Sequence, residues 1–179
     1  MKQLALHKPD TKWAMAFENF RQALSTNTDG LILAIEHIGS TSIDDLPAKD
    51  IVDVQCAVTD FETIDAIGEI LESMGFHYLK TIRQDHVPFH EADFFHPDWE
   101  KRFFKGVFDD QVFNIHIRKF QSKNWQFALT FRDNLRRNSQ LRTAYLQCKE
   151  RLINAGVGLE DYCSIKDSFI DLMSLQFID

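Results

Sequence analysis

The sequence predicts an α/β fold, in which a sheet flanked by helices is followed by a helical C-terminal part. Residues 31–38 and 51–58 are rich in β-branched and aliphatic side chains, and helical patterns flank them. Residues 123–177 show helical periodicity instead. The length of 179 residues and the hydrophobic content of 44% fit one domain. We expect a sheet-bearing core over about 1–120 and a helical part over about 121–179 packed on it.

The first half of the chain alternates helices and strands. Pro9 and Asp10 precede an apolar stripe with helical spacing, formed by Trp13, Phe17, Phe20 and Leu24. Gly75 ends a second apolar helical stripe. In chain order, the predicted elements are an opening helix, a strand over 31–38, a loop over 39–49, a strand over 51–58, a helix over 61–74 and a short strand over 76–80.

The second half begins with an unusual segment. Residues 84–100 hold His86, His90 and His96, five acids and two prolines, without Lys or Arg, which predicts a loop or lid. Such a loop could bind a transition metal, but Pro88 interrupts helical spacing between two of the histidines, and a polar surface loop is the favoured interpretation. The remaining predicted elements are a hairpin of strands 101–108 and 111–118, and helices over 123–137, 141–155 and 159–177.

The composition excludes several classes of protein. The longest apolar run, residues 31–35, is too short for a membrane span, and we expect no secretory signal, because no basic segment followed by an apolar one opens the sequence. The three cysteines are far apart and form no C-x-x-C pair, which favours a reduced, cytoplasmic protein. The net charge of −7 disfavours nonspecific DNA binding. Residues 118–151, however, carry nine Lys or Arg against two acids, which points to an anionic ligand near that segment.

The candidate site lies where the strand 31–38 ends. Gly39 is followed by the hydroxyl residues Ser40, Thr41 and Ser42, and the next strand carries Asp53 on the face opposite its apolar side chains. Backbone amides and hydroxyls of such a turn can hold phosphate oxygens, with a cap of the local turn as the alternative role. A strand carboxylate can bind Mg²⁺ beside a phosphate. Lys49 is placed to counter the phosphate charge.

These residues resemble the signature of GrpB-like proteins, and the resemblance extends over nearly the whole chain, from about residue 13 to 170. The matching positions are Glu36-His37-Ile38-Gly39-Ser40-Thr41-Ser42, Leu46, Ala48-Lys49, Ile51-Val52-Asp53, Arg102-Phe103-Phe104, Ile115-His116-Ile117, Phe131-Arg132-Asp133, Leu135-Arg136, Tyr145, Lys149, Tyr162, Lys166 and Phe169-Ile170. The resemblance implies the polymerase-beta-type nucleotidyltransferase fold, with its mixed sheet flanked by helices. It also implies Gly39 and Ser40 as phosphate contacts and Asp53 as a metal-binding acid.

The superfamily pattern is incomplete in this chain. The position of the second acid is held by Gln55, and the inward-facing set on strand 111–118 is Asn114, His116 and Arg118, without a carboxylate. Glu36 is a weak candidate for a further metal oxygen, and His116 is a candidate catalytic residue beside Asp53. The alternatives are a structural, hydrogen-bonded Asp53 and a core His116. Magnesium is therefore the implied cofactor, but two-metal chemistry lacks its usual acids.

The helical part supplies further candidates for anion binding. Arg132 and Arg136 are four residues apart, so both project from one helix face, where they would either bind phosphate or anchor the helix by salt bridges. Tyr145 with Lys149, and Lys166 after Tyr162, would extend the same cleft.

Two functions follow from these residues. The first is a cytoplasmic nucleotidyltransferase-fold protein that binds a nucleotide or phosphorylated small ligand, with metal-dependent nucleotidyl transfer as its reaction. The second is a degenerate, non-catalytic module that binds a nucleotide, RNA or protein on the same fold.

Overall fold

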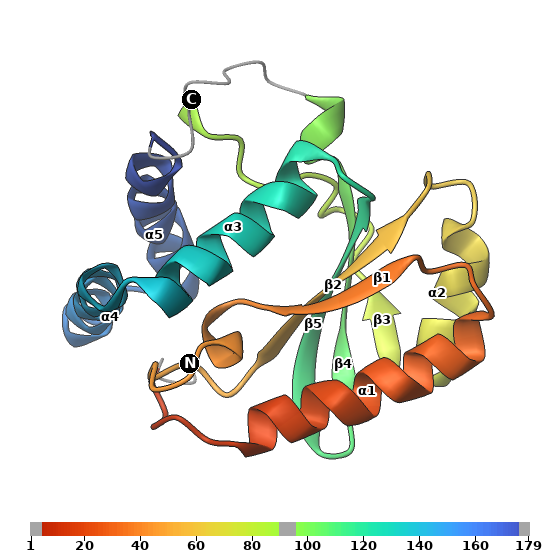
Figure 1. The fold of residues 1–179 in the computed structure, drawn as a ribbon, viewed down its shortest axis with the longest axis horizontal. Coiled ribbons are helices and arrows are strands. Elements are labelled where there is room, and N and C mark those ends of the chain that lie inside the picture. Colours follow the sequence, from red (N-terminus) through yellow and green to blue (C-terminus); the bar gives the residue numbers. More distant parts are fainter. Residues whose placement is uncertain (1–4, 90–95, 176–179) are drawn as a thin grey trace.

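The computed structural model describes residues 5–89 and 96–175, which form a five-stranded mixed sheet flanked by helices (Figure 1). The strands are β1 (Ala34–Ile38), β2 (Val52–Val58), β3 (Phe76–Tyr78), β4 (Lys101–Phe108) and β5 (Gln111–Lys119). Their order in the sheet is β1-β2-β5-β4-β3. Only the central pair among these strands, β2 and β5, is parallel, and the other neighbours are antiparallel. The predicted fold class is confirmed.

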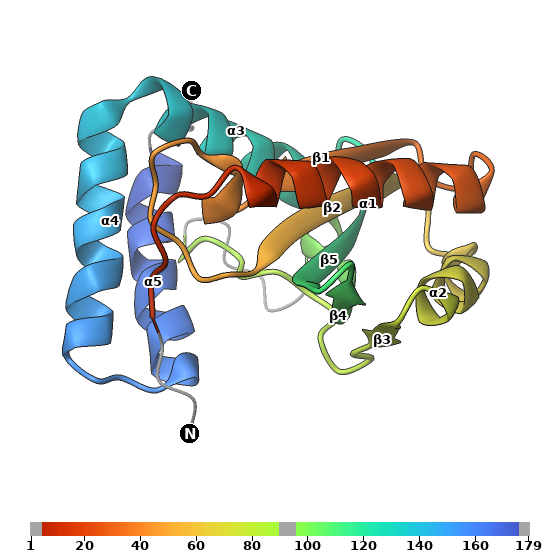
Figure 2. The ribbon, with the colours of Figure 1, turned by 90° about the horizontal axis from the view of Figure 1, so that it is seen from below.

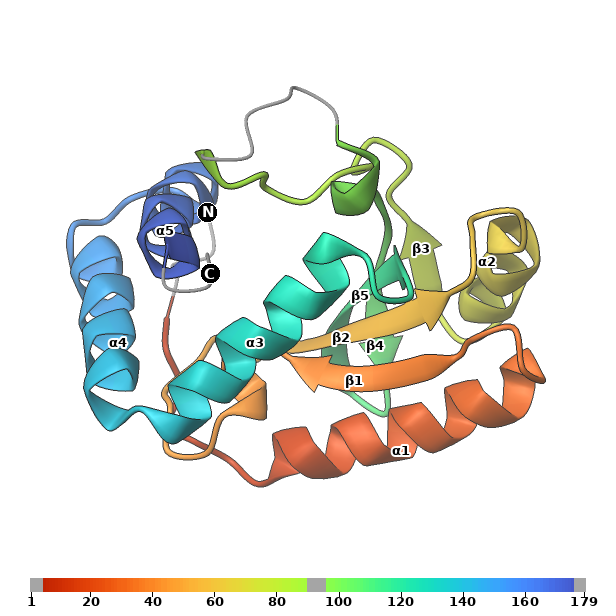
Figure 3. The same ribbon diagram turned by 45° about the horizontal axis from the view of Figure 1, so that its top comes forward.

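The helices are divided between the two faces of the sheet. They are α1 (Lys12–Thr28), α2 (Ile64–Ser73), α3 (Lys123–Arg137), α4 (Ser139–Asn154) and α5 (Leu159–Ser174). The first two pack on the face that carries the main apolar core. Helix α3 passes over β2 and leads away from the sheet to α4 and α5, which lie side by side (Figures 2 and 3). The helical C-terminal part thus leans over the opposite face.

Strand alternation in β2 builds the main core. Val52, Val54, Cys56 and Val58 point to the α1–α2 face and are at most 1% exposed, as their spacing predicts. Phe20 of α1 packs there against aromatic rings of β3 and β5. Burial of each large apolar side chain contributes roughly 1.5–3 kcal/mol. Asp53 is thereby turned toward the other face.

The boundaries of several elements differ from the sequence prediction; α2 and β3, for example, are shorter than the predicted 61–74 and 76–80, and two other differences have clear local reasons. Strand β1 begins at Ala34 rather than at residue 31, because the amide of Leu31 donates to the carbonyl of Thr28 in a turn. Helix α4 begins at Ser139 rather than at residue 141, because the Asn138 side chain accepts a hydrogen bond from the Leu141 amide and caps the helix. In the described residues, no helix combines the length and apolar character needed to cross a membrane.

Candidate functional site

A cavity of about 430 Å³ opens between the sheet face opposite the main core, the loop after β1, and helices α3, α4 and α5. Its volume lies within the range of roughly 300–1,000 Å³ that is typical of small-molecule sites. The sequence-predicted residues that line it are Gly39, Ser40, Thr41, Lys49, Asp53, His116, Tyr145, Lys149 and Lys166. Positions more than a hundred residues apart in the chain therefore meet in one place.

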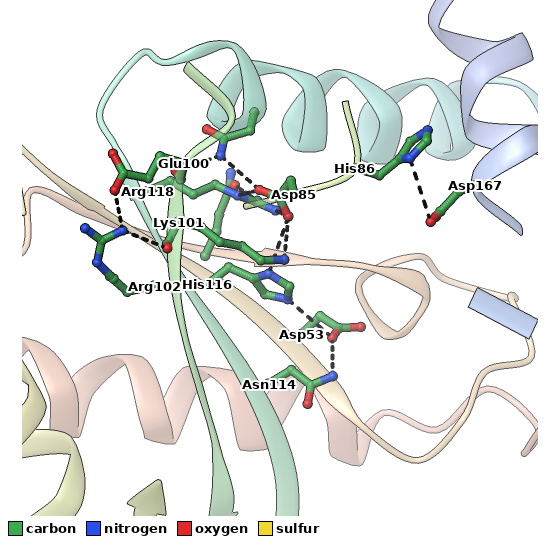
Figure 4. A network of polar contacts seen from close by, with 12 residues as sticks. Asp53, Asp85, His86, Glu100, Lys101, Arg102, Asn114, His116, Arg118 and Asp167 are labelled. Carbon is green, nitrogen blue, oxygen red and sulfur yellow. Dashed lines mark hydrogen bonds and ion pairs between the residues drawn. The ribbon is translucent and has the colours of Figure 1, made fainter. Parts of the chain in front are cut away.

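The parallel pair β2–β5 sets a row of polar side chains across the cavity floor (Figure 4). The Asn114 amide donates to Oδ1 of Asp53 over 2.8 Å, and Nε2 of His116 lies 3.9 Å from the same oxygen. The prediction that Asp53 and His116 share a face is confirmed. Burial opposes the charge on Asp53, but the His116 ring and the Asn114 amide outweigh it and hold the pKa of Asp53 below its usual value.

His116 is neutral at pH 7 in this setting. Burial, with the charges of Lys101 and Arg118, lowers its pKa to about 4. Its Nδ1 atom is buried, lies 4.0 Å from Oδ1 of Asp85 and has no hydrogen-bond partner among the described residues. The ring also meets Phe103 edge-on, with the centroids 4.9 Å apart. His116 therefore offers the cavity an uncharged imidazole beside a charged Asp53.

Gly39 lies directly against the Asp53 side chain, where a larger residue would overlap the carboxylate. Its backbone has φ +70° and ψ −173°, a combination that is essentially restricted to glycine. A Cβ at this position would lie 2.4 Å from Oδ2 of Asp53. The glycine that ends β1 is therefore required both for the turn and for the close approach of the carboxylate to the backbone.

The three hydroxyls after Gly39 make different contacts. Thr41 pairs with Nε2 of His37 at 3.0 Å, and the Ser42 hydroxyl donates to the carbonyl of Gly39 over 2.6 Å. Ser42 is not among the residues that line the cavity. Ser40 lines it and contacts Lys149, so Ser40 is the hydroxyl of the three that lies within a cationic part of the cavity.

Asp85 is a buried carboxylate that sequence reasoning did not assign to the site. It accepts hydrogen bonds from Arg118, Lys101 and Asn124 at 2.7–3.0 Å (Figure 4). These partners hold the pKa of Asp85 far below its usual value, although burial opposes its charge. The sequence did offer one signal. Lys101 at the start of β4 pairs with Arg118 near the end of β5, and neither strand carries a carboxylate to balance these two charges. Their partner comes from the predicted lid loop.

Gln55 is tied into the same cluster. Its Oε1 atom accepts from Arg118, and its Nε2 atom donates to the carbonyl of Trp125 over 3.4 Å. The side chain is 0% exposed and is not among those lining the cavity. The neutral amide suits both neighbours, since it supplies an acceptor to a guanidinium and a donor to a carbonyl.

Three lysines from separate segments of the chain, Lys49, Lys149 and Lys166, line the cavity. Lys149 of α4 is 2% exposed and donates to Ser40 over 3.1 Å and to the carbonyl of Pro47 over 2.7 Å. Burial, with the charges of Lys166 and Lys49, lowers the pKa of Lys149 to about 7. Lys49 lies over the ring of Tyr162, 4.8 Å from its centroid, and burial with the charge of Lys166 lowers its pKa as well.

The predicted contribution of Arg132, Arg136 and Glu36 to the cleft needs correction. None of them is among the residues that line the cavity. Arg132 donates to Glu36 and Asp133, each over 2.8 Å, and Arg136 donates twice to the carbonyl of Ser42. These arginines anchor α3 to the β1 edge, which is the alternative role that their spacing allowed. Glu36 is the register partner of Gln55, so it lies on the same face as Asp53 but two residues further along the strands, where it is bonded to Arg132.

The donor set does not fit a two-metal centre. Asp53 is a single carboxylate, Gln55 replaces its partner, and the oxygens of Asp85 are already occupied by Arg118, Lys101 and Asn124. Within residues 5–89 and 96–175, no group of three His, Cys, Asp or Glu side chains could hold a metal ion. A divalent ion bridging phosphate oxygens needs several carboxylates.

The histidines of the predicted lid have separate roles. His86 bonds to Asp171 of α5 over 2.7 Å and lies 4.0 Å from Asp167. Nδ1 of His96 accepts from the amide of Asp98 and caps a short 3-10 turn. His90 lies outside the described residues.

Comparison with known proteins identifies the family. The sequence matches the GrpB protein family over residues 3–175. The chain belongs to the GrpB family. A UPF0157 protein of Halalkalibacterium halodurans is 31% identical over 150 residues, which cover 83% of this chain and 69% of that protein. A dephospho-CoA kinase of Mycobacterium tuberculosis is 33% identical over 128 residues. That match covers 65% of this GrpB chain but only 31% of the kinase.

Solved structures agree with this assignment. The crystal structure of the conserved protein GrpB from Enterococcus faecalis superposes with a TM-score of 0.77 at 26% identity and covers 96% of both chains. Cid1 in complex with the UTP analogue UMPNPP gives a TM-score of 0.50 at 13% identity, covering 82% of this chain and 43% of that one. The second likeness shows that the GrpB chain has a nucleotidyltransferase-type fold.

Proposed function

We propose that this GrpB protein binds a nucleotide or another phosphorylated small ligand in the cavity. The observation that carries the proposal is the convergence of Lys49, Lys149 and Lys166 on one cavity, where Lys149 contacts Ser40 and experiences the charges of the other two. Ammonium groups and a hydroxyl are ordinary partners of phosphate oxygens, and three like charges in one cavity favour an anion between them. The Cid1 complex with a UTP analogue supports the choice of a nucleotide, by analogy of fold.

Aromatic side chains of the cavity suit the organic part of such a ligand. Trp99, Phe103, Phe127 and Phe131 line it together with the lysines. A mostly apolar pocket with a few convergent polar groups is the usual form of a small-molecule site. The cavity therefore offers cationic groups for a phosphate and aromatic surfaces for a base or similar group.

Metal-dependent nucleotidyl transfer, with Asp53 and His116 as catalytic residues, stays a prediction from the family resemblance. The neutral Gln55 and the occupied Asp85 favour the second hypothesis, a protein that binds its ligand without polymerase-type chemistry. A search for Mg²⁺-dependent release of pyrophosphate from nucleoside triphosphates, in wild type and Asp53→Asn, would decide between the two.

Screening the melting temperature against nucleoside mono-, di- and triphosphates tests the binding function. A ligand at about 100 times its Kd stabilises the native state by about 2.7 kcal/mol, or about 5–10 °C for a chain of this size. We expect Lys149→Met to reduce this shift to about half or less, because the variant keeps the buried stem but loses the ammonium group. Arg151→Met is the matched control, since Arg151 is an exposed cation on the same helix. A shift that is undiminished in Lys149→Met, or no shift with any nucleotide, would contradict the proposal.

Binding is also expected to depend on pH. With a pKa of about 7 and Lys49, Lys166, Tyr145 and Glu150 around it, Lys149 loses its proton just above neutrality in the free protein. A phosphate favours the protonated form, so affinity should fall between pH 7 and 9, by up to about tenfold per pH unit. Calorimetric titrations across that range would measure the slope. Lys149→Met should make the affinity less dependent on pH. An equal pH dependence in wild type and variant would show that Lys149 does not contact the ligand.

A further inference from the structure

Resting on the proposed function, we infer that the cavity binds its ligand as a free organic phosphate, without a divalent cation, and that Lys49, Lys149 and Lys166 supply the positive charge. The ligand class is a phosphate or pyrophosphate ester with an aromatic organic part. This inference goes beyond phosphate binding, because the usual site on this fold would take a metal–nucleotide complex.

The first support is the origin of the three lysines. Lys49 comes from the loop before β2, Lys149 from α4 and Lys166 from α5, so the fold gathers them from three separate segments. Each acts electrostatically on another: the charges of Lys49 and Lys166 both weaken proton binding by Lys149. Placing like charges together in a partly buried cavity costs free energy unless an anion joins them.

The second support is the state of the cavity carboxylates. Both oxygens of Asp85 accept hydrogen bonds from cationic groups or from Asn124, and Asp167 lies 4.0 Å from the His86 ring. Asp53 remains, with Oδ1 bonded to Asn114 and Oδ2 packed over Gly39. One such carboxylate, facing the charge of Lys166, is a poor site for Mg²⁺, which needs near-octahedral oxygen ligands.

The third support is the charge balance along the cavity. Lys101 and Arg118 are paired with Asp85, whereas Lys49, Lys149 and Lys166 share two carboxylates, Asp53 and Asp167, both of which face Lys166. A free phosphate brings negative charge to these three lysines, whereas a bound divalent cation would add positive charge there. The protein's own ammonium groups are thus suited to neutralise the phosphate charge, which metal ions do in two-metal transfer.

Titration calorimetry of the full chain with inorganic pyrophosphate, in EDTA and in excess Mg²⁺, tests the inference. We expect binding in EDTA to be at least as tight as in Mg²⁺. Lys149→Met and Lys166→Met should each weaken it about 10–100-fold, the range for losing a hydrogen bond between charged groups. Arg151→Met should change it less than about twofold, as for an exposed charge outside the site. Asp53→Asn should leave binding unchanged or tighten it, because it removes a negative charge beside the anion.

Four results would overturn the inference. The first is binding that requires Mg²⁺, and the second is binding that is lost in Asp53→Asn; in both of these the phosphate-binding function stands. The third is an affinity in EDTA that is unchanged in both lysine variants, which would place the anion elsewhere. The fourth is no binding of pyrophosphate in either buffer, and the nucleotide melting screen then decides separately whether the proposed function survives. Melting curves of the ligand-free variants verify that each is folded.

Discussion

Asp85→Asn is expected to destabilise the protein by about 3–5 kcal/mol, the cost of removing one partner from a buried ion pair. In the native chain, Lys101 and Arg118 are at most 8% exposed and both donate to this carboxylate. An amide keeps the size of the side chain but leaves two buried cations without a counter-charge. Urea unfolding at pH 7 would measure the loss, with Asp44→Asn, at an exposed loop position, as the control.

The pH dependence of this effect has a definite sign. Because the pKa of Asp85 is depressed in the folded state, its contribution to stability is complete above the unfolded value of about 3.9 and is lost as pH falls below it. The difference between wild type and Asp85→Asn should therefore shrink in acid. Adding Lys101→Met to the variant should recover part of the loss. Equal stability of wild type and Asp85→Asn at pH 7 would show that the cluster is not structural.

The strands and the floor of the cavity follow from local patterns. Alternation in residues 51–58 places Val52 and Val54 in the core and Asp53 opposite them, and the same rule places Asn114 and His116 on the face of Asp53. The pairs Tyr145–Lys149 and Tyr162–Lys166, each one helical turn apart, were also expected at the cleft, and all four residues line it. To predict these features it is enough to know the side-chain periodicity of each element and which of its faces is apolar.

The rest of the site depends on how whole segments are oriented. The spacing of Arg132 and Arg136 shows that they share a face of α3, but the rotation of that helix turns this face to the β1 edge instead of the cavity. Asp85 lies in a loop whose path no periodicity describes, and its partners are distant in the chain. Neither the partner of a loop acid nor the rotation of a helix can be read from one sequence.

Gly39→Ala is expected to cost about 3–5 kcal/mol and to displace Asp53. The backbone conformation alone costs about 1–3 kcal/mol for a residue with a side chain. The added methyl group would lie 2.4 Å from Oδ2 of Asp53, so the carboxylate must move and strain its hydrogen bond with Asn114. A hydrogen bond of a charged group contributes about 1.5–3 kcal/mol. Denaturant unfolding measures the total loss.

A matched glycine separates these two causes. Gly156 has φ +69°, close to that of Gly39, but a Cβ there would meet nothing within 4 Å. Gly156→Ala should therefore show only the backbone cost of a positive φ, about 1–2 kcal/mol. In an Asp53→Ala background, which removes the closest contact, Gly39→Ala should cost less than in wild type by the share that the clash contributes. If Gly39→Ala is no more costly than Gly156→Ala, and its cost is the same in both backgrounds, the close packing of Asp53 on the turn is not what makes glycine necessary.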